Sequence, residues 1–250
     1  PERNNFTDNY NYPFLKQEKL LDVEFGYQYQ GSNWHAGANF YYMGYDNQLV
    51  QTGQESEIGE ALTTNVKDSY RMGMELSAGW APLSWLSFEG NAALSKNKIK
   101  DFDEYVEDWG SNTGTRVNHY DNSTLSFSPS AILNGFVDFH YAGFSATWHT
   151  NFVSSQYLDN SESKDRSLPC YSQSDLSLNY TSAVKKALGI KQVTLGLDFN
   201  NVFNRHYAPS GFVWYNAINE EGDYTNDHRL TALSYIPMAG FTCMAHLTLK

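Results

Sequence analysis

Hydrophobic and polar residues alternate with a period of two along most of this chain. The clearest run lies between residues 69 and 80. Its even positions are apolar or aromatic, and its odd positions are small or polar, including the charged residues Arg71 and Glu75. Strict alternation places the two kinds of side chain on opposite faces of a β-strand. We distinguish nine such runs and expect each of them to form a strand. They cover approximately residues 20–30, 34–46, 66–80, 85–98, 125–141, 144–157, 170–180, 191–201 and 239–249.

The expected connections between these strands alternate between short and long. The short connections are 31–33, 81–84, 142–143 and 181–190, and the long polar ones are about 47–65, 99–124, 158–169 and 202–238. No segment predicts a helix longer than the turn-like stretch at 182–190. This asymmetry is typical of an antiparallel up-and-down barrel of the bacterial outer membrane, which has tight periplasmic turns and long outer loops. A soluble β-sandwich tends to mix both lengths at each end, and a soluble β protein stays an alternative at this point.

Aromatic residues mark two levels along the expected strands. Those beside the short turns are Tyr29, Trp34, Trp80, Tyr141, Phe144 and Tyr180, and a second group contains Tyr42, Tyr70, Phe127 and Phe152. Tyrosine and tryptophan favour membrane interfaces, because the ring is apolar and its tip is polar. Ten residues of a tilted strand rise about 25 Å, which is the height of a lipid-facing band. We therefore interpret the first group as membrane-interface aromatics and the polar parity of each strand as the wall of an aqueous lumen.

Composition and charge exclude several other classes. The 250 residues contain 28 acidic and 17 basic side chains, with a formal net charge of −11, so general binding to nucleic acid is excluded. Two cysteines cannot build a disulfide framework or a four-thiolate zinc site. Because Cys170 and Cys243 fall on strands that are not neighbours, we expect both thiols to be free. No motif of an active-site nucleophile, a zinc protease or a phosphate-binding loop is present, so no catalytic residue is predicted.

In the C-terminal third of the chain, Asn201, Phe203, Asn204 and Tyr207 form an N-x-F-[ND]-x-x-Y motif, and a proline-glycine stretch with Pro237 and Gly240 leads into the last strand. This arrangement resembles the end of TonB-dependent outer-membrane receptors. Three upstream segments resemble the family in the correct order, namely 15–29, 40–53 and 65–80. The general style of the sequence resembles receptors of Bacteroidetes.

This resemblance implies an all-β, antiparallel, up-and-down transmembrane barrel, of which residues 1–250 form the C-terminal portion. About nine strands would be present out of about 22 in a complete barrel, and we expect the plug domain and the N-terminal strands to be absent from this chain. The location implied is the bacterial outer membrane, with the long loops extracellular and the short turns periplasmic.

The implied function is TonB-dependent active uptake of a scarce solute, and not an enzymatic reaction. A metal chelate such as a siderophore, haem or cobalamin is the favoured cargo. The implied partners are outer-membrane lipid and lipopolysaccharide, the remainder of the receptor including its plug domain, and the TonB-ExbB-ExbD inner-membrane complex; a surface lipoprotein is a further candidate. A passive porin and a soluble all-β carbohydrate-binding module are the alternatives.

Two of the long connections combine acidic and aromatic residues. Clusters of carboxylates at 101–112 and 219–227 supply the oxygen ligands that Ca²⁺ uses, but neither has the spacing of a known calcium loop, so solvated acidic loops are the simpler interpretation and no cofactor is predicted. Exposed aromatic rings give a large contact area at low entropic cost. The candidate cargo contacts are Tyr105, Trp109, Phe212, Trp214, Tyr215 and Tyr224. The alternative for these rings is that they pack the loops against each other.

Overall fold

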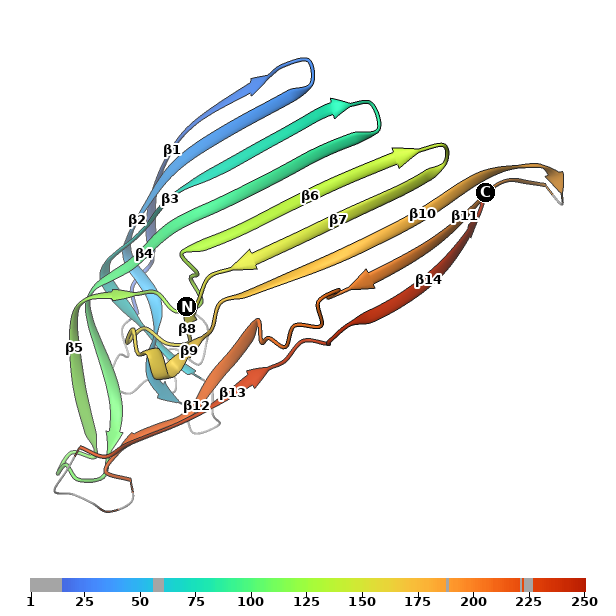
Figure 1. Ribbon diagram of the computed structural model, residues 1–250. Coiled ribbons are helices and arrows are strands. Elements are labelled where there is room, and N and C mark those ends of the chain that lie inside the picture. Colours follow the sequence, from blue (N-terminus) through green and yellow to red (C-terminus); the bar gives the residue numbers. More distant parts are fainter. Residues whose placement is uncertain (1–14, 56–60, 188, 221, 223–226) are drawn as a thin grey trace.

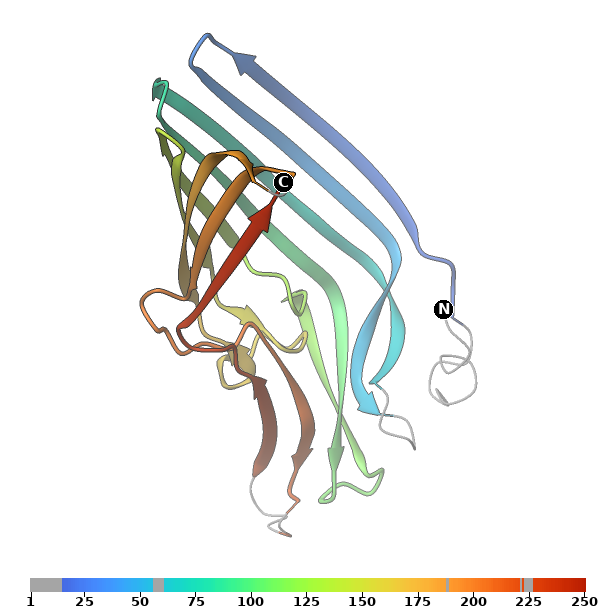
Figure 2. The ribbon, with the colours of Figure 1, turned by 90° about the vertical axis from the view of Figure 1, so that its right-hand side faces the viewer.

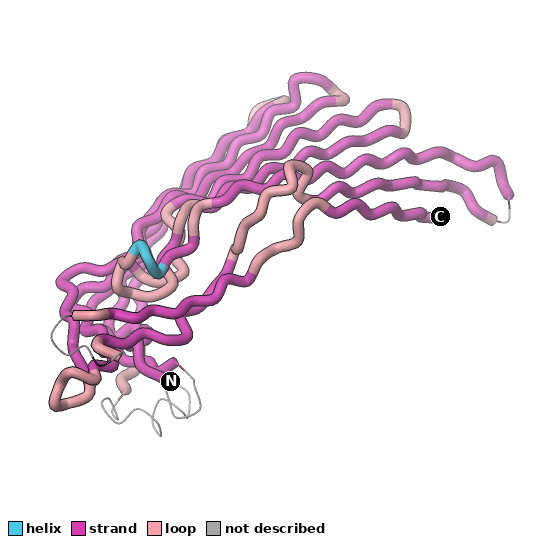
Figure 3. Tube along the Cα trace, turned by 60° about the horizontal axis from the view of Figure 1, so that its bottom comes forward, coloured by secondary structure: helices cyan, strands magenta, loops and turns pink. Residues whose placement is uncertain are grey.

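The computed structural model describes residues 15–55, 61–187, 189–220, 222 and 227–250. The regular elements in this part of the chain are strands, apart from one short 3₁₀ turn, η1 (Lys164–Arg166) (Figure 3). The strands are β1 (Lys19–Gln30), β2 (Trp34–Glu55), β3 (Ala61–Leu83), β4 (Leu86–Asp108), β5 (Thr115–Thr124), β6 (Ala131–Tyr141), β7 (Phe144–Val153), β8 (Gln156–Tyr157), β9 (Ser167–Leu168), β10 (Tyr171–Ala187), β11 (Ile190–Asn200), β12 (Ser210–Ile218), β13 (Arg229–Ile236) and β14 (Thr242–Leu249). Among the described residues, no helical segment has the length and hydropathy to cross a membrane.

Nine strands pair side by side in the order β1-β2-β3-β4-β6-β7-β10-β11-β14 (Figure 1). Every pairing along this path is antiparallel. These are the nine strands that the alternation predicts, so the predicted fold class is confirmed. β1 and β14 lie at the two ends of the path and, among the described strands, each pairs on one side only. The result is a curved open sheet, which is one wall of a barrel and not a closed one (Figure 2).

The long connections are more ordered than the sequence predicts. β2 and β3 continue past residue 46 as a paired hairpin, the β4–β5 hairpin fills most of 99–124, and the β12–β13 hairpin lies within 202–238. We call this end of the sheet the extension, and the opposite end, with the tight connections, the turn end. The prediction of long loops was wrong here because few residues of the first two of these hairpins are apolar, so their alternation is weak; Val50 is one of the few, and it is buried. The turn-like stretch 182–190 is also strand on both sides of Gly189.

Two residues in the left-handed conformation separate the extension from the rest of the sheet. Asn47 has φ +60° and Asp101 has φ +52°, a conformation that Asn and Asp tolerate better than most residues. In β4 the side chains that are buried change from odd to even positions at Asp101. Ile99 is buried before it, and Phe102 and Glu104 are buried after it. A small hydrophobic core of Val50, Val66, Ile99, Phe102 and Leu125 lies at this junction. The polar side of the sheet thereby becomes the packed interior of the extension.

Candidate functional site

One face of the nine-stranded sheet is predominantly apolar. The strand register aligns Phe25, Phe40, Met74 and Leu94 across four neighbouring strands, and it aligns Tyr180, Leu195 and Leu247 near the other edge. These side chains are open to the surroundings; Phe25 is 72% exposed and Leu247 is 59% exposed. Water-soluble monomers seldom expose a continuous apolar surface of this size. We call this surface the apolar face, and it fits contact with lipid chains.

The predicted interface aromatics lie on the apolar face at the turn end. Tyr29 and Trp34 stack with ring centroids 4.6 Å apart, and Trp80 stacks with Phe88 at 5.9 Å. Tyr141, Phe144 and Tyr180 follow on the strands beyond, with Phe144 opposite both tyrosines in the register. In the second aromatic group, Tyr42 stacks on Tyr70 at 6.2 Å. Phe127 is different from its prediction, because it follows β5 and lines a cavity on the other face.

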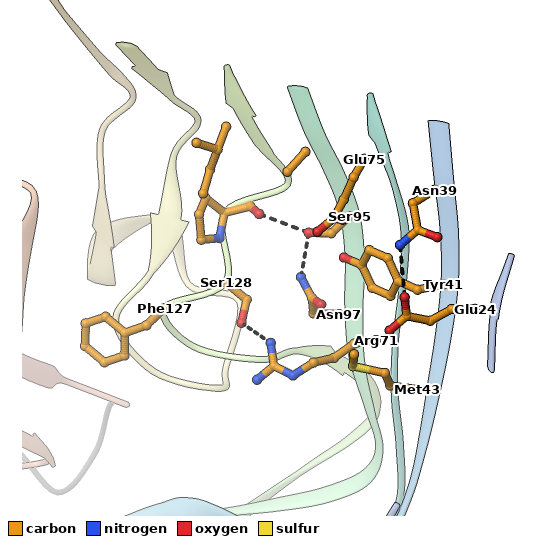
Figure 4. Close-up of a pocket in the computed structure, with 13 residues that line it drawn as sticks. Glu24, Asn39, Tyr41, Met43, Arg71, Glu75, Ser95, Asn97, Phe127 and Ser128 are labelled. Carbon is orange, nitrogen blue, oxygen red and sulfur yellow. Dashed lines mark hydrogen bonds between the residues drawn. The ribbon is translucent and has the colours of Figure 1, made fainter. Parts of the chain in front are cut away.

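The other face of the sheet is polar and carries a cavity of about 360 Å³ (Figure 4). Its hydrogen bonds connect strands to the segment that precedes β6: Arg71 Nη1 donates to Ser128 Oγ at 3.1 Å. On the sheet itself, Asn39 Nδ2 donates to Glu24 Oε2 at 3.1 Å, and Glu75 lies in the same wall. So many charged and amide groups are suited to lining a water-filled lumen or to binding a polar ligand. We call this surface the polar face.

Histidine–carboxylate pairs recur on the polar face. His35 Nε2 lies 3.2 Å from Glu89 Oε2, and His246 Nδ1 lies 3.3 Å from Asp198 Oδ2. Gly79 separates His35 from Glu89, and a Cβ there would meet both side chains at 2.5 Å or less, so the glycine is what permits this contact. These histidines are therefore engaged with carboxylates of the sheet, as polar lumen residues are.

A buried carboxylate joins three parts of the extension. Glu104 on β4 is 3% exposed, and its Oε1 accepts hydrogen bonds from Arg166 Nη2 at 3.1 Å and from Arg229 Nη2 at 2.8 Å. Its Oε2 accepts from Tyr120 Oη at 2.9 Å and from Asn118 Nδ2 at 3.2 Å. Burial, together with the neighbouring Glu104 charge, raises the pKa of Tyr120 to about 12. Glu104 thus holds β5, β13 and the segment around η1 together.

The segment around η1 is held by further polar contacts of its own side chains. Arg166 Nε lies 2.5 Å from Asp159 Oδ2, within that segment. Glu162 accepts hydrogen bonds from Lys98 on β4 and from Thr124 on β5. Partial burial alone would raise the pKa of Glu162, but these two hydrogen bonds outweigh it, and the pKa is lowered. The connection at 158–169 is consequently fixed against the inside of the β4–β5 hairpin.

The β12–β13 hairpin lies against the tip of the β4–β5 hairpin. β12 pairs parallel to the end of β4, with Ala217 opposite Glu107 and Ile218 opposite Asp108. The Trp109 amide donates to the Ile218 carbonyl at 3.2 Å. Figures 1 and 2 both show the two hairpins side by side. The two acidic and aromatic connections lie far apart in sequence but adjacent in space, and they therefore form one structure.

Asp108 secures this contact with both of its oxygens. Asn219 Nδ2 donates to Oδ1 at 3.0 Å, and Arg116 Nε donates to Oδ2 at 3.0 Å. Arg116 also reaches Asp227 across the junction, at 2.5 Å. Burial by itself would raise the pKa of Asp108, but the hydrogen bonds from Asn219 and the Gly110 amide and the charge of Arg116 lower it overall.

The residues of the N-x-F-[ND]-x-x-Y pattern form a turn that joins the end of β11 to the start of β14. Asn201 is buried and has φ +51°; its side chain donates to the Arg205 carbonyl at 2.8 Å and to the Ala239 carbonyl at 3.1 Å. Asn204 Oδ1 accepts from the Phe241 amide at 2.9 Å. Asparagine suits both positions for two reasons. It tolerates their positive φ, and its side-chain amide group forms hydrogen bonds with backbone groups that no strand pairing satisfies.

The barrel-domain model described as "TonB dependent receptor-like, beta-barrel" matches residues 2–202, most of the chain. The chain belongs to this TonB-dependent receptor family. Membership places the receptor segment in the bacterial outer membrane. The family consists of transporters and not of enzymes.

Solved structures of other receptors share the fold of this TonB-dependent receptor segment. The copper transporter OprC has a TM-score of 0.62 at 19% identity, with 94% of this chain and 32% of that chain covered. The ferric-catecholate import receptor Fiu from E. coli K12 has a TM-score of 0.60 at 15% identity, covering 93% and 28%. The ferric yersiniabactin uptake receptor FyuA from Yersinia pestis has a TM-score of 0.55 at 16% identity, covering 92% and 30%. The chain therefore spans about a third of the length of these receptors. No curated protein sequence matches the chain.

The candidate cargo contacts of this receptor segment come from the two joined hairpins. Trp109 is 60% exposed beyond the end of β4, Phe212 is 50% exposed on β12, and Tyr105 lies half-buried on β4. Trp214 and Tyr215 belong to β12, but their side chains, like the whole of Tyr224, lie outside the described residues. The structure thus brings the strands that carry these residues together.

The calcium interpretation fails for the two buried acids of 101–112. Glu104 is bound by two arginines and Asp108 by one, so neither carboxylate is free to bind an ion. Of the other loop, Glu221 and Asp223 lie outside the described residues. The arginines Arg166, Arg229 and Arg116, which hold this site together, were missed by sequence reasoning, because nothing local links them to the acids that they bind.

Proposed function

We propose that this chain is one side of the barrel of a receptor that takes up a scarce solute across the outer membrane, with energy from the TonB-ExbB-ExbD complex. The observation that carries the proposal is the division of the nine-stranded sheet into a predominantly apolar face and a polar face. Strands from the remainder of the receptor would pair with the free edges of β1 and β14 and close the barrel. The polar face would then enclose the lumen and face a plug domain.

The turn end is proposed to be periplasmic and the extension extracellular. Outer-membrane barrels have tight turns on the periplasmic side and long structures outside, and the extension contains the β2–β3, β4–β5 and β12–β13 hairpins. Its buried ionic contacts give the outer mouth a fixed shape. A fixed mouth favours selective binding, because less conformational entropy is lost when cargo binds.

A metal chelate is the favoured cargo. The similar solved structures are a copper transporter, a ferric-catecholate import receptor and a ferric yersiniabactin uptake receptor. Exposed Trp109 and Phe212, on the two joined hairpins, are the proposed first contacts for such a ligand, and the remaining aromatic residues of β12 would extend that surface.

Uptake by cells tests the proposal. A strain that lacks the gene is supplied with the complete receptor and with labelled ferric or copper chelates, and accumulation is measured with and without a functional TonB protein. The account expects accumulation that needs both the receptor and TonB. Flux that persists without TonB, together with ion conductance in planar bilayers, would instead indicate a passive porin. Recovery of the protein as a monomer in detergent-free buffer would indicate a soluble β protein.

A further inference from the structure

A groove of about 480 Å³ opens where the apolar face ends below the extension. Trp148 and Thr150 of β7 and Ser174 of β10 form its floor, and these residues lie on the apolar parity of their strands. The turn that follows β11 forms its side, with Phe203, Arg205 and His206. The groove is thus built from three segments and lies at the boundary of the proposed lipid band.

The floor of the groove changes from apolar to hydroxyl-bearing over a few residues. Phe203 is 62% exposed and meets Trp148 edge to face, with centroids 5.8 Å apart. Directly beyond the indole, Trp148 Nε1 donates to Thr150 Oγ1 at 2.9 Å, and the hydroxyls of Thr150 and Ser174 lie 2.8 Å apart. An aromatic wall next to a row of hydroxyls suits an amphiphile whose acyl part ends in a sugar or phosphate group.

The charge of the groove is positive, in a chain whose net charge is −11. Arg205 and His206 are both exposed, and among the described residues no carboxylate forms an ion pair with either side chain. The backbone of Arg205 is fixed, because Asn201 Oδ1 accepts from its amide at 2.8 Å and Asn201 Nδ2 donates to its carbonyl at 2.8 Å. A fixed arginine without an acidic partner at a lipid boundary is suited to binding a phosphate group.

We propose that this groove binds the phosphorylated sugar headgroup of a glycolipid of the outer leaflet, the lipid A part of lipopolysaccharide. An acyl chain would lie on Trp148 and Phe203, the sugar would face the hydroxyls of Thr150 and Ser174, and a phosphate would contact Arg205. The inference rests on the proposed topology, since only an extracellular extension puts the groove in the outer leaflet. A bound lipid at this position would hold the turn after β11 against β7 and β10.

Lipid binding to the complete receptor tests this inference. The receptor is purified in detergent and delipidated, and native mass spectrometry measures its binding to lipid A, to dephosphorylated lipid A and to phosphatidylglycerol. Arg205→Gln is compared with Lys191→Gln, which removes an exposed positive charge near the turn end. We expect lipid A to bind, and we expect the dephosphorylated lipid and Arg205→Gln each to weaken binding by about tenfold, the loss of one charge-assisted hydrogen bond. Lys191→Gln should bind as the parent does.

Equal binding of lipid A by both variants, equal binding of its phosphorylated and dephosphorylated forms, or equal binding of phosphatidylglycerol would each overturn the inference. Phe203→Ala provides a second test, with weaker binding expected from loss of the aromatic wall. The TonB-dependent uptake assay is run on the same variants. Uptake by the parent without specific lipid A binding would refute the lipid site alone, whereas lipid A binding without TonB-dependent uptake would refute the proposed transport function alone.

Discussion

Glu104 on β4 and Arg229 on β13 form a hydrogen-bonded ion pair of 2.8 Å across 125 residues of sequence. Arg166 shares the same carboxylate oxygen, so one buried negative charge compensates two arginines from different connections. Removing one partner of a buried ion pair is much more destabilising than exchanging the whole group for apolar residues. The pair therefore controls whether the outer hairpins remain joined.

Glu104→Gln should release the β12–β13 hairpin from the β4–β5 hairpin. Arg229 would lose its counter-charge and Arg166 would keep only Asp159, at a cost of about 3 kcal/mol, which corresponds to roughly a hundredfold loss of local protection against exchange. Hydrogen–deuterium exchange of β12 and β13, measured by mass spectrometry, checks this result. Glu107→Gln, on the exposed parity of the same strand, is the matched control and should exchange as the parent does. Equal protection in both variants would show that the buried pair does not hold the hairpins.

Acid should loosen the same junction through Asp108. The folded state lowers the pKa of this carboxyl below 3.8, so its contribution to stability is complete above that value and is lost as the pH falls through the lower folded pKa. Exchange of β12 should be slow at pH 6 and faster, relative to β6, at pH 3. Asp108→Asn should show fast exchange at both pH values. A parent protein with unchanged relative protection at pH 3 would contradict the role given to Asp108.

Asn201→Gly should weaken the closure between β11 and β14. Glycine tolerates the positive φ of this position, so the substitution removes mainly the side-chain hydrogen bonds to Arg205 and Ala239. Because the carbonyls left behind are partly buried, we expect a loss of about 3 kcal/mol. The temperature at which the barrel loses its compact migration on gels checks this result. Asn200→Gly, which removes one longer contact of 3.3 Å to Thr242, is the control and should cost clearly less.

The nine strands and their two faces could be predicted from the sequence because each depends on residues two positions apart in one strand. The alternation at 69–80 alone assigns Leu76 to one face and Ser77 to the other. The joining of the outer hairpins could not be predicted in this way. The parallel contact of β12 with β4 and the capture of Glu104 by Arg166 and Arg229 depend on how connections more than 50 residues apart fold back over the sheet. The alternation also does not reveal the left-handed conformation of Asp101, which changes the side chains of β4 that are buried from odd to even positions.

An arginine on the apolar face should be far more harmful than one on the polar face. Leu76 lies midway between the two aromatic levels on β3, and Ser77 is its neighbour on the opposite face. Leu76→Arg should cost about 2–4 kcal/mol in a bilayer, because the charge would enter hydrocarbon. Ser77→Arg should cost little. Refolding of both receptors into lipid vesicles, followed by denaturant titration, gives the two free energies of unfolding; equal values would mean that Leu76 does not face lipid.

The most direct test of the central claim is spin-label accessibility along β3 in native outer-membrane vesicles. Single cysteines are placed at each position from 70 to 80 except Gly73 and Gly79, where a Cβ would meet neighbouring atoms at 2.3 Å or less, in a receptor whose own exposed thiols, Cys170 and Cys243, have been replaced. Each label is then probed with molecular oxygen, which partitions into lipid, and with a water-soluble nickel chelate. The account predicts that even positions are accessible to oxygen and odd positions to the nickel chelate, with a period of two across the segment. Accessibility to oxygen that does not alternate, or even positions that prefer the nickel chelate, would contradict a membrane-facing apolar face.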